Sequence, residues 1–362
     1  MKGFLELGKV LGIKIEIHWT FALLLIWIGL VEFENSGNLE KVITSQGLIL
    51  VLMACVVLHE LGHALMARMY NIKTKSIILL PIGGVATLDK ISKKPKQELL
   101  IALAGPAVNL IIVLLLALFI PLRSYFNFDT VLIDEQLYQP TFQNFLFYLL
   151  IANLILVIFN LIPAFPMDGG RVLRALLSFR LSRVEATSIA SGIAQGLATL
   201  FFIVGLLFSP FLVLIAFFIF FGAYGENQMV KQYAILEGHT AKEATLTNIT
   251  LLNLATKIDE VIELVLSSTE KDFVVFDNQR IEGVLNQKQI IENARSRTLL
   301  VGDILDRSVG FIDANTPITE VLERMQKEKN NFFPVTENGE IIGAIDRSNI
   351  SEFILLKSTE NQ

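Results

Sequence analysis

Six long apolar runs constrain what this chain can fold into. A helix needs about 20 apolar residues to cross the hydrocarbon core of a bilayer, and six runs come near that length. Hydrophobic residues make up 53% of the sequence, which is unlike an ordinary soluble chain. The sequence therefore predicts a polytopic α-helical membrane protein with about six transmembrane helices. The runs cover residues 18–32, 46–70, 99–120, 143–163, 186–208 and 211–226.

The placement of charge predicts how these helices are oriented. Lysines gather between the second and third runs and arginines after the fourth, whereas the opposite loops carry mainly Asp and Glu. Loops rich in Lys and Arg face the cytoplasm, so six spans leave both termini on the cytoplasmic side. Arg171 and Arg174 are expected to act as such orientation charges. No extended basic stripe is present and the formal charge is -5, so we expect no nucleic-acid partner.

The pattern changes from about residue 240 onward. Short β-rich strings such as FVVF (273–276) and FFPV (332–335) alternate with amphipathic helical stretches. The order helix, strand, turn, strand, helix occurs twice, with a period of about 55 to 60 residues. We expect residues 1–230 to form the membrane domain and residues 240–362 a cytoplasmic tandem α/β module. Its repeats would cover about 243–295 and about 300–357.

The apolar second run contains the motif H-E-L-G-H. Histidines four residues apart lie on one face of a helix, so His59 and His63 can both bind one zinc ion while Glu60 points at its water. Zinc lowers the pKa of that water, and Glu60 can take its proton and pass it to a leaving amine. The motif predicts a metalloprotease.

A catalytic zinc site needs a third protein ligand. His18, beside a tryptophan at a membrane boundary, is expected to be an interfacial anchor, and Asp89, followed by lysines, to be solvated. Asp168 ends the fourth run in N-L-I-P-A-F-P-M-D-G-G, where Pro163 and Pro166 must interrupt the helix. This break can turn the carboxylate toward the second run. An ordinary helix cap is the alternative role for Asp168.

Two motifs in this order resemble those of a known family. H-E-L-G-H, followed about a hundred residues later by N-x-x-P-x-x-P-x-D-G at 160–169, is similar to the site-2 protease family of intramembrane zinc metalloproteases. G-I-K-I-E-I-H-W at 12–19 resembles the family's strand before the first helix, and A-G-P-A-V-N at 104–109 its small-residue motif in the third. The resemblance covers about residues 8–225.

The resemblance implies a function and a set of site residues. His59, His63 and Asp168 would bind one Zn²⁺ per chain, Glu60 would be the catalytic base, and Asn160 would hold the substrate or the developing oxyanion. The enzyme would be an endopeptidase of the bilayer. It would cut single-span membrane proteins within or near their transmembrane segments, in regulated intramembrane proteolysis.

A glycine-containing segment, L-L-P-I-G-G-V-A-T-L at 79–88, follows the H-E-L-G-H helix. Its pattern predicts a strand or re-entrant turn at Gly83 and Gly84. A free strand edge there could pair with an unwound substrate by β-addition, similar to a role proposed in the family. A structural hairpin is the alternative. In the 104–109 motif, Gly105 predicts close helix packing and Asn109 a hydrogen bond between helices.

The C-terminal module resembles a pair of CBS domains. Such pairs commonly bind adenine nucleotides or form dimers, which implies a regulatory or dimerising role here and a homodimer as one partner state. The nucleotide motif is altered, because Asn286 and Asp346 stand where Thr or Ser is expected and only Asn349 resembles its acidic end. Asp346 and Asn349 are the candidate nucleotide-binding residues.

Two other functions are compatible with polar residues in membrane helices. One is a transporter regulated by CBS domains, since ionisable groups in membrane spans also mark ion pathways. The other is an inactive scaffold that binds zinc without cutting. Glu60 favours the protease over the transporter, because only hydrolysis needs a carboxylate beside the water on the metal.

Overall fold

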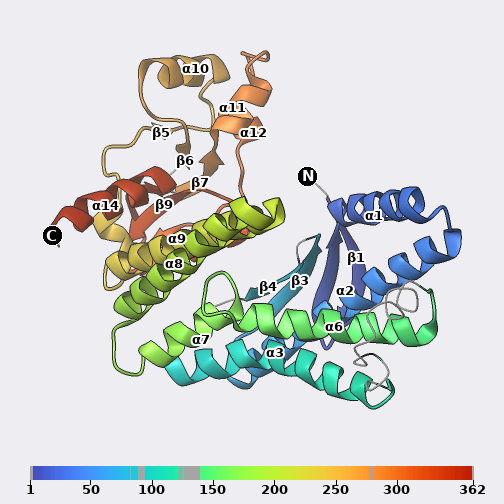
Figure 1. Ribbon diagram of the computed structural model, residues 1–362. Coiled ribbons are helices and arrows are strands. Elements are labelled where there is room, and N and C mark those ends of the chain that lie inside the picture. The colour runs from blue at the N-terminus through green and yellow to red at the C-terminus, as the bar shows by residue number, and fades with distance from the viewer. Residues whose placement is uncertain are drawn as a thin grey trace. The chain divides into compact units, whose positions relative to one another are not determined.

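The computed structural model describes residues 3–81, 83–88, 94–121, 125, 139–277 and 280–360. It divides into two compact units, Met1–Gln228 and Met229–Gln362. Figure 1 shows the helices and strands of each unit.

The first unit consists mainly of helices. Five helices of the described residues are long and apolar enough to cross a membrane: α2, α3, α6, α8 and α9. Only 17% to 33% of their most apolar windows is buried inside the protein, so most of their apolar side chains point outward, as contact with lipid requires. The helices are α1 (Thr20–Ser36), α2 (Leu39–Met69), α3 (Pro95–Ala117), α6 (Phe142–Leu161), α7 (Asp168–Leu177), α8 (Arg183–Phe208) and α9 (Pro210–Leu236).

The first apolar run forms a shorter helix than the others. α1 has 17 residues and therefore spans about 26 Å, which is less than the hydrocarbon core of about 30 Å. It ends at Gly37, whose left-handed backbone (φ 61°) suits a residue without a Cβ atom. With 17 residues it lies at the lower end of the length range of membrane-spanning helices, about 17 to 25 residues.

Side-chain caps explain where several helices begin. The Asn38 side chain accepts a hydrogen bond from the Glu40 backbone N–H at the start of α2. Ser182 and Glu185 exchange bonds with each other's backbone N–H at the start of α8, which is a capping box. These caps satisfy backbone donors that have no partner inside the helix.

A four-stranded sheet packs on α2. Its order is β1-β2-β3-β4, with β2 and β3 parallel and the two outer pairs antiparallel. Ile15 of β2 and Ile77 of β3 lie in one apolar core with Val56, Leu61 and Ala64 of α2. The segments expected as strands at 12–19 and 79–88 are both in this sheet, so it lies against the helix that carries H-E-L-G-H. The strands are β1 (Phe4–Val10), β2 (Ile13–His18), β3 (Thr74–Leu80) and β4 (Gly83–Leu88).

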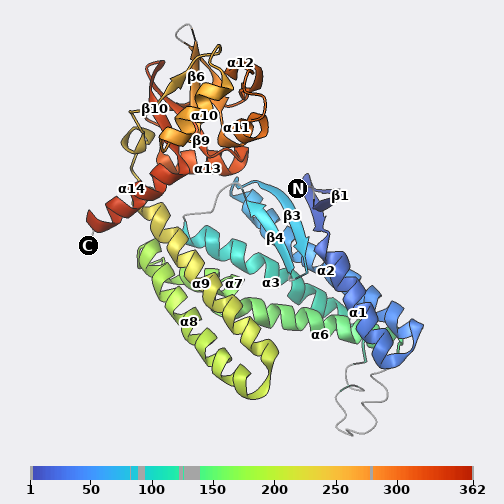
Figure 2. The same cartoon turned by 90° about the horizontal axis from the view of Figure 1, so that it is seen from above.

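The remaining helices of this unit surround α2 and the break after α6. α3 packs along both α2 and α6, and Figure 2 shows α3 and α6 side by side. α6 ends at Leu161, and a non-helical segment at 162–167 with Pro163 and Pro166 leads into α7, as the sequence predicts. The side chains of Ala164, Phe165 and Met167 in this segment are buried in one core with α8 and α9.

The second unit contains two repeats of similar order. Each has a three-stranded sheet in which a short strand pairs parallel with a longer one that forms an antiparallel hairpin. The first repeat comprises β5 (Leu251–Leu252), α10 (Ile258–Ser267), β6 (Phe273–Asp277), β7 (Arg280–Leu285) and α11 (Gln287–Asn293). The second comprises β8 (Ile312–Asp313), α13 (Ile318–Glu328), β9 (Phe332–Glu337), β10 (Glu340–Asp346) and α14 (Arg347–Glu360). Short helices η1 (Ala241–Ala244) and α12 (Val301–Ile304) precede them.

The two repeats exchange backbone pairs. Leu246, which precedes the first repeat, bonds in both directions with Ala344 of β10, and Asp306, which precedes the second, bonds in both directions with Val284 of β7. An apolar core contains residues of both hairpins, including Val274, Val284 and Phe332. The repeats therefore form one body.

Candidate active site

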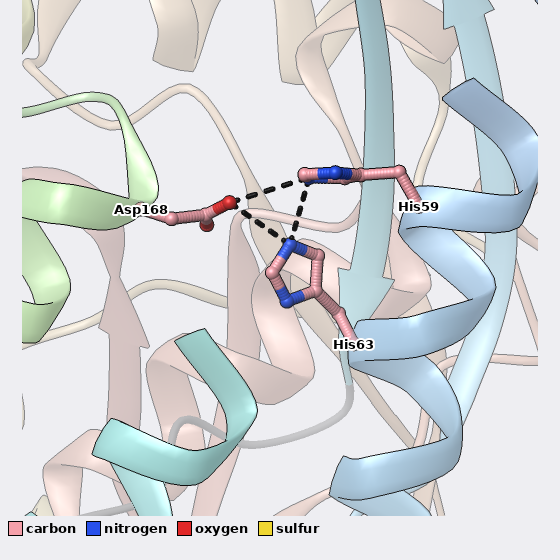
Figure 3. Close-up of side chains that lie close together, drawn as sticks. All are labelled: His59, His63 and Asp168. Carbon is pink, nitrogen blue, oxygen red and sulfur yellow. Dashed lines mark hydrogen bonds and ion pairs between the residues drawn. The ribbon is translucent and has the colours of Figure 1, made fainter. Parts of the chain in front are cut away.

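Two imidazoles of α2 point to the same place. His59 and His63 lie one turn apart on the helix, and both are buried. Their Nε2 atoms are 3.0 Å apart. Figure 3 shows the two rings turned toward a shared point beside the helix.

Asp168 completes a three-residue cluster at this point. It is the first residue of α7, and its Oδ2 atom lies 3.1 Å from His63 Nε2 and 3.3 Å from His59 Nε2 (Figure 3). The three ligand atoms all fall within 4.8 Å of one another. Tetrahedral zinc with bonds of about 2.0 to 2.2 Å would hold such atoms about 3.4 Å apart, so the donor set and its spacing fit zinc.

The far nitrogen of each ring has a hydrogen-bond acceptor. His63 Nδ1 lies 2.7 Å from the carbonyl oxygen of Ile101, and His59 Nδ1 lies 3.0 Å from Oδ1 of Asn109. A carbonyl oxygen can only accept, so Nδ1 carries the proton in the neutral ring and the lone pair is on Nε2. Both imidazoles are thus held in the tautomer that binds a metal through Nε2.

A second asparagine fixes the amide of Asn109. Asn153 donates from Nδ2 to the carbonyl of Leu149 over 2.8 Å, which leaves its Oδ1 to accept from Asn109 Nδ2 over 3.3 Å. The oxygen of Asn109 must then face His59. Asn109 was expected only to bond between helices, and Asn153 was not recognised, although an asparagine inside the apolar run 143–163 is itself a signal of a buried polar contact.

Gly105 of α3 leaves the space between the ligands open. A Cβ atom at this position would lie 2.2 Å from His63 Nε2 and 2.6 Å from His59 Nε2. Any side chain would therefore occupy the position of a bound ion. The 104–109 motif predicts that α3 packs closely on another helix, and the residues that it approaches at Gly105 are His59 and His63.

Glu60 belongs to α2, like the two histidines, and its side chain lies against β4 of the sheet. Its side chain is half-buried, and a Cβ atom on Gly84 of β4 would lie 2.7 Å from its Cγ and 3.1 Å from its Oε1. The backbone of β4 thus passes directly against Glu60. Gly83, the preceding residue, has a φ of 136°, a conformation that L side chains rarely adopt.

Close packing also holds the start of α7 against the segment 162–167. A Cβ atom on Gly169 would lie 2.1 Å from the carbonyl oxygen of Ile162, and one on Gly170 would lie 2.6 Å from the carbonyl carbon of Ala164. Two glycines are needed for the chain to fold back on the start of α7. Asn160 lies half-buried near the end of α6, before this segment.

Two other candidates from the sequence lie apart from the cluster or outside the described residues. His18 Nδ1 bonds to the Thr20 hydroxyl over 2.7 Å, and its ring is tilted by 45° against that of Trp19, with the ring centres 5.7 Å apart. Asp89 lies outside the described residues. Within the described part of the chain, His59, His63 and Asp168 form the one group of three such residues that could hold a metal.

The nucleotide candidates of the second unit bond to each other. Asn349 N–H donates to Asp346 Oδ1 over 2.8 Å, and Asp346 N–H donates to Asn349 Oδ1 over 3.2 Å, so the pair caps the start of α14. Asn286 and Gln289 make the same exchange at the start of α11. These polar groups have structural partners in both repeats.

Comparison with known proteins identifies the family. The model of peptidase family M50 matches residues 47–205, which include the candidate metal cluster of His59, His63 and Asp168, and the CBS domain model matches residues 301–356. A zinc metalloprotease of Methanocaldococcus jannaschii is 35% identical over 349 residues, covering 96% of this chain and 94% of that protein. The chain belongs to peptidase family M50. It is a CBS-containing zinc metalloprotease of the site-2 protease family and a multi-pass membrane protein.

Further relatives include a sporulation protein and a solved protease. Stage IV sporulation protein FB of Bacillus subtilis is 26% identical over 269 residues, covering 72% of this chain and 82% of that protein. A solved site-2 protease from Methanocaldococcus jannaschii is 38% identical and covers 62% of this chain and 95% of its own, with a TM-score of 0.44. As an intramembrane zinc protease, this M50 member hydrolyses peptide bonds with the help of zinc.

Proposed function

We propose that His59, His63 and Asp168 hold the catalytic zinc and that Glu60 is the general base. The observation that carries this proposal is the convergence of three buried ligand atoms within 4.8 Å, with both Nδ1 atoms bonded to acceptors. Three lone-pair donors so close together repel one another unless a cation lies between them. The open space opposite Gly105 suits such an ion.

The residues around the site would have different roles in hydrolysis. Zinc, when bound, supplies an electrophile for the scissile carbonyl and a more acidic water. Glu60, adjacent to a ligand and half-exposed, takes the proton from the attacking water and delivers it to the leaving nitrogen. Asn160 is proposed to hold the substrate or the developing oxyanion from the end of α6.

The edge of β4 is proposed to present the substrate. Within the described residues, β4 pairs on one side with β3 and ends the sheet on the other. A transmembrane helix must unwind before its peptide bonds can be cut, and an unwound stretch could add to this edge by backbone hydrogen bonds. Because Gly84 brings β4 against Glu60, a strand added there would lie beside the base. A purely structural hairpin at Gly83 and Gly84 is the alternative.

We infer single-span membrane proteins as substrates and the bilayer as the site of reaction. The distribution of Lys and Arg favours a cytoplasmic location for both termini and the CBS domains, which requires α1 to cross the bilayer together with the five longer helices. The polar cluster among helices with outward apolar side chains supports cleavage at membrane depth. Residues 1–230 would carry this activity.

The CBS pair, residues 240–362, is proposed as a regulatory or dimerising module. Adenine nucleotide binding at Asp346 and Asn349 would compete with the cap that these residues form with each other, which favours the dimerising role. A homodimer through this pair is the expected partner state.

Cleavage of a panel of single-span substrates by detergent-purified protein tests the proposal. Wild type should cut and Glu60→Gln should not, with a loss of at least about 100-fold, while both bind equal zinc. His63→Ala should lose zinc and cleavage together. Equal cleavage by Glu60→Gln would rule out Glu60 as the base. Zinc bound without cleavage by either protein would favour an inactive scaffold, and the absence of zinc from both would remove the proposed centre.

A further inference from the structure

A buried arginine lies just beyond the metal cluster. Arg174 of α7 is 1% exposed, the largest of the fully buried side chains in the described chain. It was expected to be an orientation charge, yet its guanidinium is enclosed by other elements. A charge held at this depth needs partners on every side.

Three elements supply those partners. Arg174 Nε donates to Glu98 Oε1 of α3 over 2.8 Å, and its Nη1 donates to Glu226 of α9. Its guanidinium carbon also lies 5.0 Å from the ring centre of Phe165, in the segment before Asp168. Arg183 of α8 donates to the second oxygen of Glu98 over 3.3 Å. In this group of described residues, the charges of Glu98 and Glu226 balance those of the two arginines.

The residues that make these contacts, Phe165 and Arg174, lie on either side of Asp168 in the sequence. Phe165 lies three residues before Asp168, and Arg174 lies six residues after it on the same helix, about 9 Å along the axis. The helix that binds Arg174 through Glu98 is α3, which also carries Gly105 at the histidines and Asn109 behind His59. Arg174 therefore ties the segment that carries the third ligand to the helix that supports the other two.

A second contact from α9 acts on the same segment. A Cβ atom on Gly222 would lie 2.7 Å from Cδ of Pro166, one helical turn before Glu226. The segment 162–167 is thus held by close packing on one side and by Arg174 on the other. Buried ion pairs add little net stability compared with apolar packing, but the fork of an arginine fixes distance and direction.

We propose that Arg174 is a positioning residue for zinc binding, which places the Asp168 carboxylate against the two imidazoles through Glu98 and Phe165. The proposal rests on Asp168 being a zinc ligand, as proposed above. Residues that orient metal ligands typically contribute about 10-fold to 100-fold to metal affinity. Arg183 should contribute much less, because it contacts Glu98 from α8 and is not part of the helix that carries Asp168.

A double-mutant cycle on full-length protein tests this role. The affinity for Zn²⁺ alone is measured by chelator competition in wild type, Arg174→Gln, Asp168→Ala and the double variant, with Arg183→Gln as the matched control. We expect Arg174→Gln to weaken zinc binding about 10-fold or more, and Arg183→Gln to change it less than about twofold. In the Asp168→Ala background Arg174→Gln should cause no further loss, since its effect passes through that carboxylate.

Each result separates the two proposals. An unchanged zinc affinity in Asp168→Ala would overturn the ligand assignment and this inference with it. If Asp168→Ala weakens zinc binding but Arg174→Gln does not, only this inference is overturned. It is also overturned if Arg174→Gln causes the same loss of zinc affinity in wild type and in the Asp168→Ala background. If Arg174→Gln does not fold, Arg174→Lys replaces it, because lysine keeps the positive charge but lacks the forked guanidinium. Its loss of zinc affinity should be smaller than that of Arg174→Gln, and it must likewise vanish in the Asp168→Ala background.

Discussion

The two units fill their interiors differently. Among the described residues, Thr336 is the one buried polar side chain of the second unit, whereas the first unit buries histidines, asparagines, acids and an arginine. Charged pairs of the second unit lie at the surface, such as Lys242 with Glu337 and Arg307 with Glu282. Exposed pairs of this kind contribute little to stability.

The difference shows what each interior is for. In the first unit most buried polar groups gather at the metal cluster or around Arg174, and each is bonded to another, so the cost of removing it from water is offset. In the second unit each repeat has an apolar core of its own, and a further apolar core together with the exchanged backbone hydrogen bonds joins the two repeats. In the first unit, buried polar contacts fix the geometry of the candidate site. In the second unit, apolar packing provides most of the stability.

The largest effect is expected from emptying an apolar core of the second unit. Phe333 is fully buried on β9, and Phe333→Ala should lower the free energy of unfolding of that unit by about 3 to 5 kcal/mol through lost packing and a cavity. Hydrogen exchange of β9 and β10 measures the loss. Phe311→Ala, at a side chain that is 60% exposed, is the control. Zinc affinity should stay unchanged, and a parallel loss of zinc would show that the site depends on the second unit.

A smaller effect is expected from a buried polar contact of the first unit. Asn109→Leu leaves the Nδ1 proton of His59 without its acceptor, so zinc affinity should fall about 10-fold to 100-fold, or about 1.4 to 2.7 kcal/mol. Chelator competition measures it. Ser191→Ala removes another buried hydrogen bond of this unit, from Ser191 Oγ to the carbonyl of Ala223, away from the metal cluster. Equal losses of zinc affinity from both variants would contradict a specific role for Asn109.

The smallest effect concerns Asp272, a half-buried acid of the second unit. Burial, and then the nearby charge of Asp346, raise the pKa of Asp272 above its ordinary value of 3.8. The folded state then keeps this proton to higher pH than the unfolded state, so stability should fall as pH rises from about 3.8 through the raised pKa.

Asp272→Asn should remove that dependence. Hydrogen exchange of β6 and β7 between about pH 4 and pH 7 measures it, after correction for the intrinsic exchange rate. Glu352→Gln makes the same change of charge on an exposed face of α14 and should leave the slope as in wild type. A slope that survives in Asp272→Asn would place its origin elsewhere.

Local patterns predict much of the fold. Apolar runs mark the helices, the prolines at 163 and 166 mark the break before Asp168, and the repeated order after residue 240 marks the tandem module. H-E-L-G-H predicts two imidazoles on one helix face because that relation depends only on helical geometry. The length of α1 is less certain from sequence, since the ends of an apolar run do not fix the ends of a helix.

Contacts between distant segments do not follow from such patterns. Glu98 and Glu226 meet Arg174 across 76 and 52 residues of sequence, and their pairing depends on how three helices pack. The charge of Arg174 is visible in the sequence, but an arginine that stands among others after a membrane span is interpreted as an orientation signal. Likewise, Asn153 gains its role only once α3 and α6 lie side by side, and the cap between Asp346 and Asn349 only once α14 begins between them.

The exchanged backbone pairs of the second unit make each of its repeats depend on the other for complete hydrogen bonding. On the edge that does not face its hairpin partner, β7 of the first repeat pairs with Asp306, and β10 of the second repeat pairs with Leu246. One edge of each hairpin is therefore covered by chain that leads into the other repeat. A truncation that removed the second repeat would therefore not leave a smaller working module. The two repeats should therefore unfold together, as one cooperative unit rather than as two independent domains.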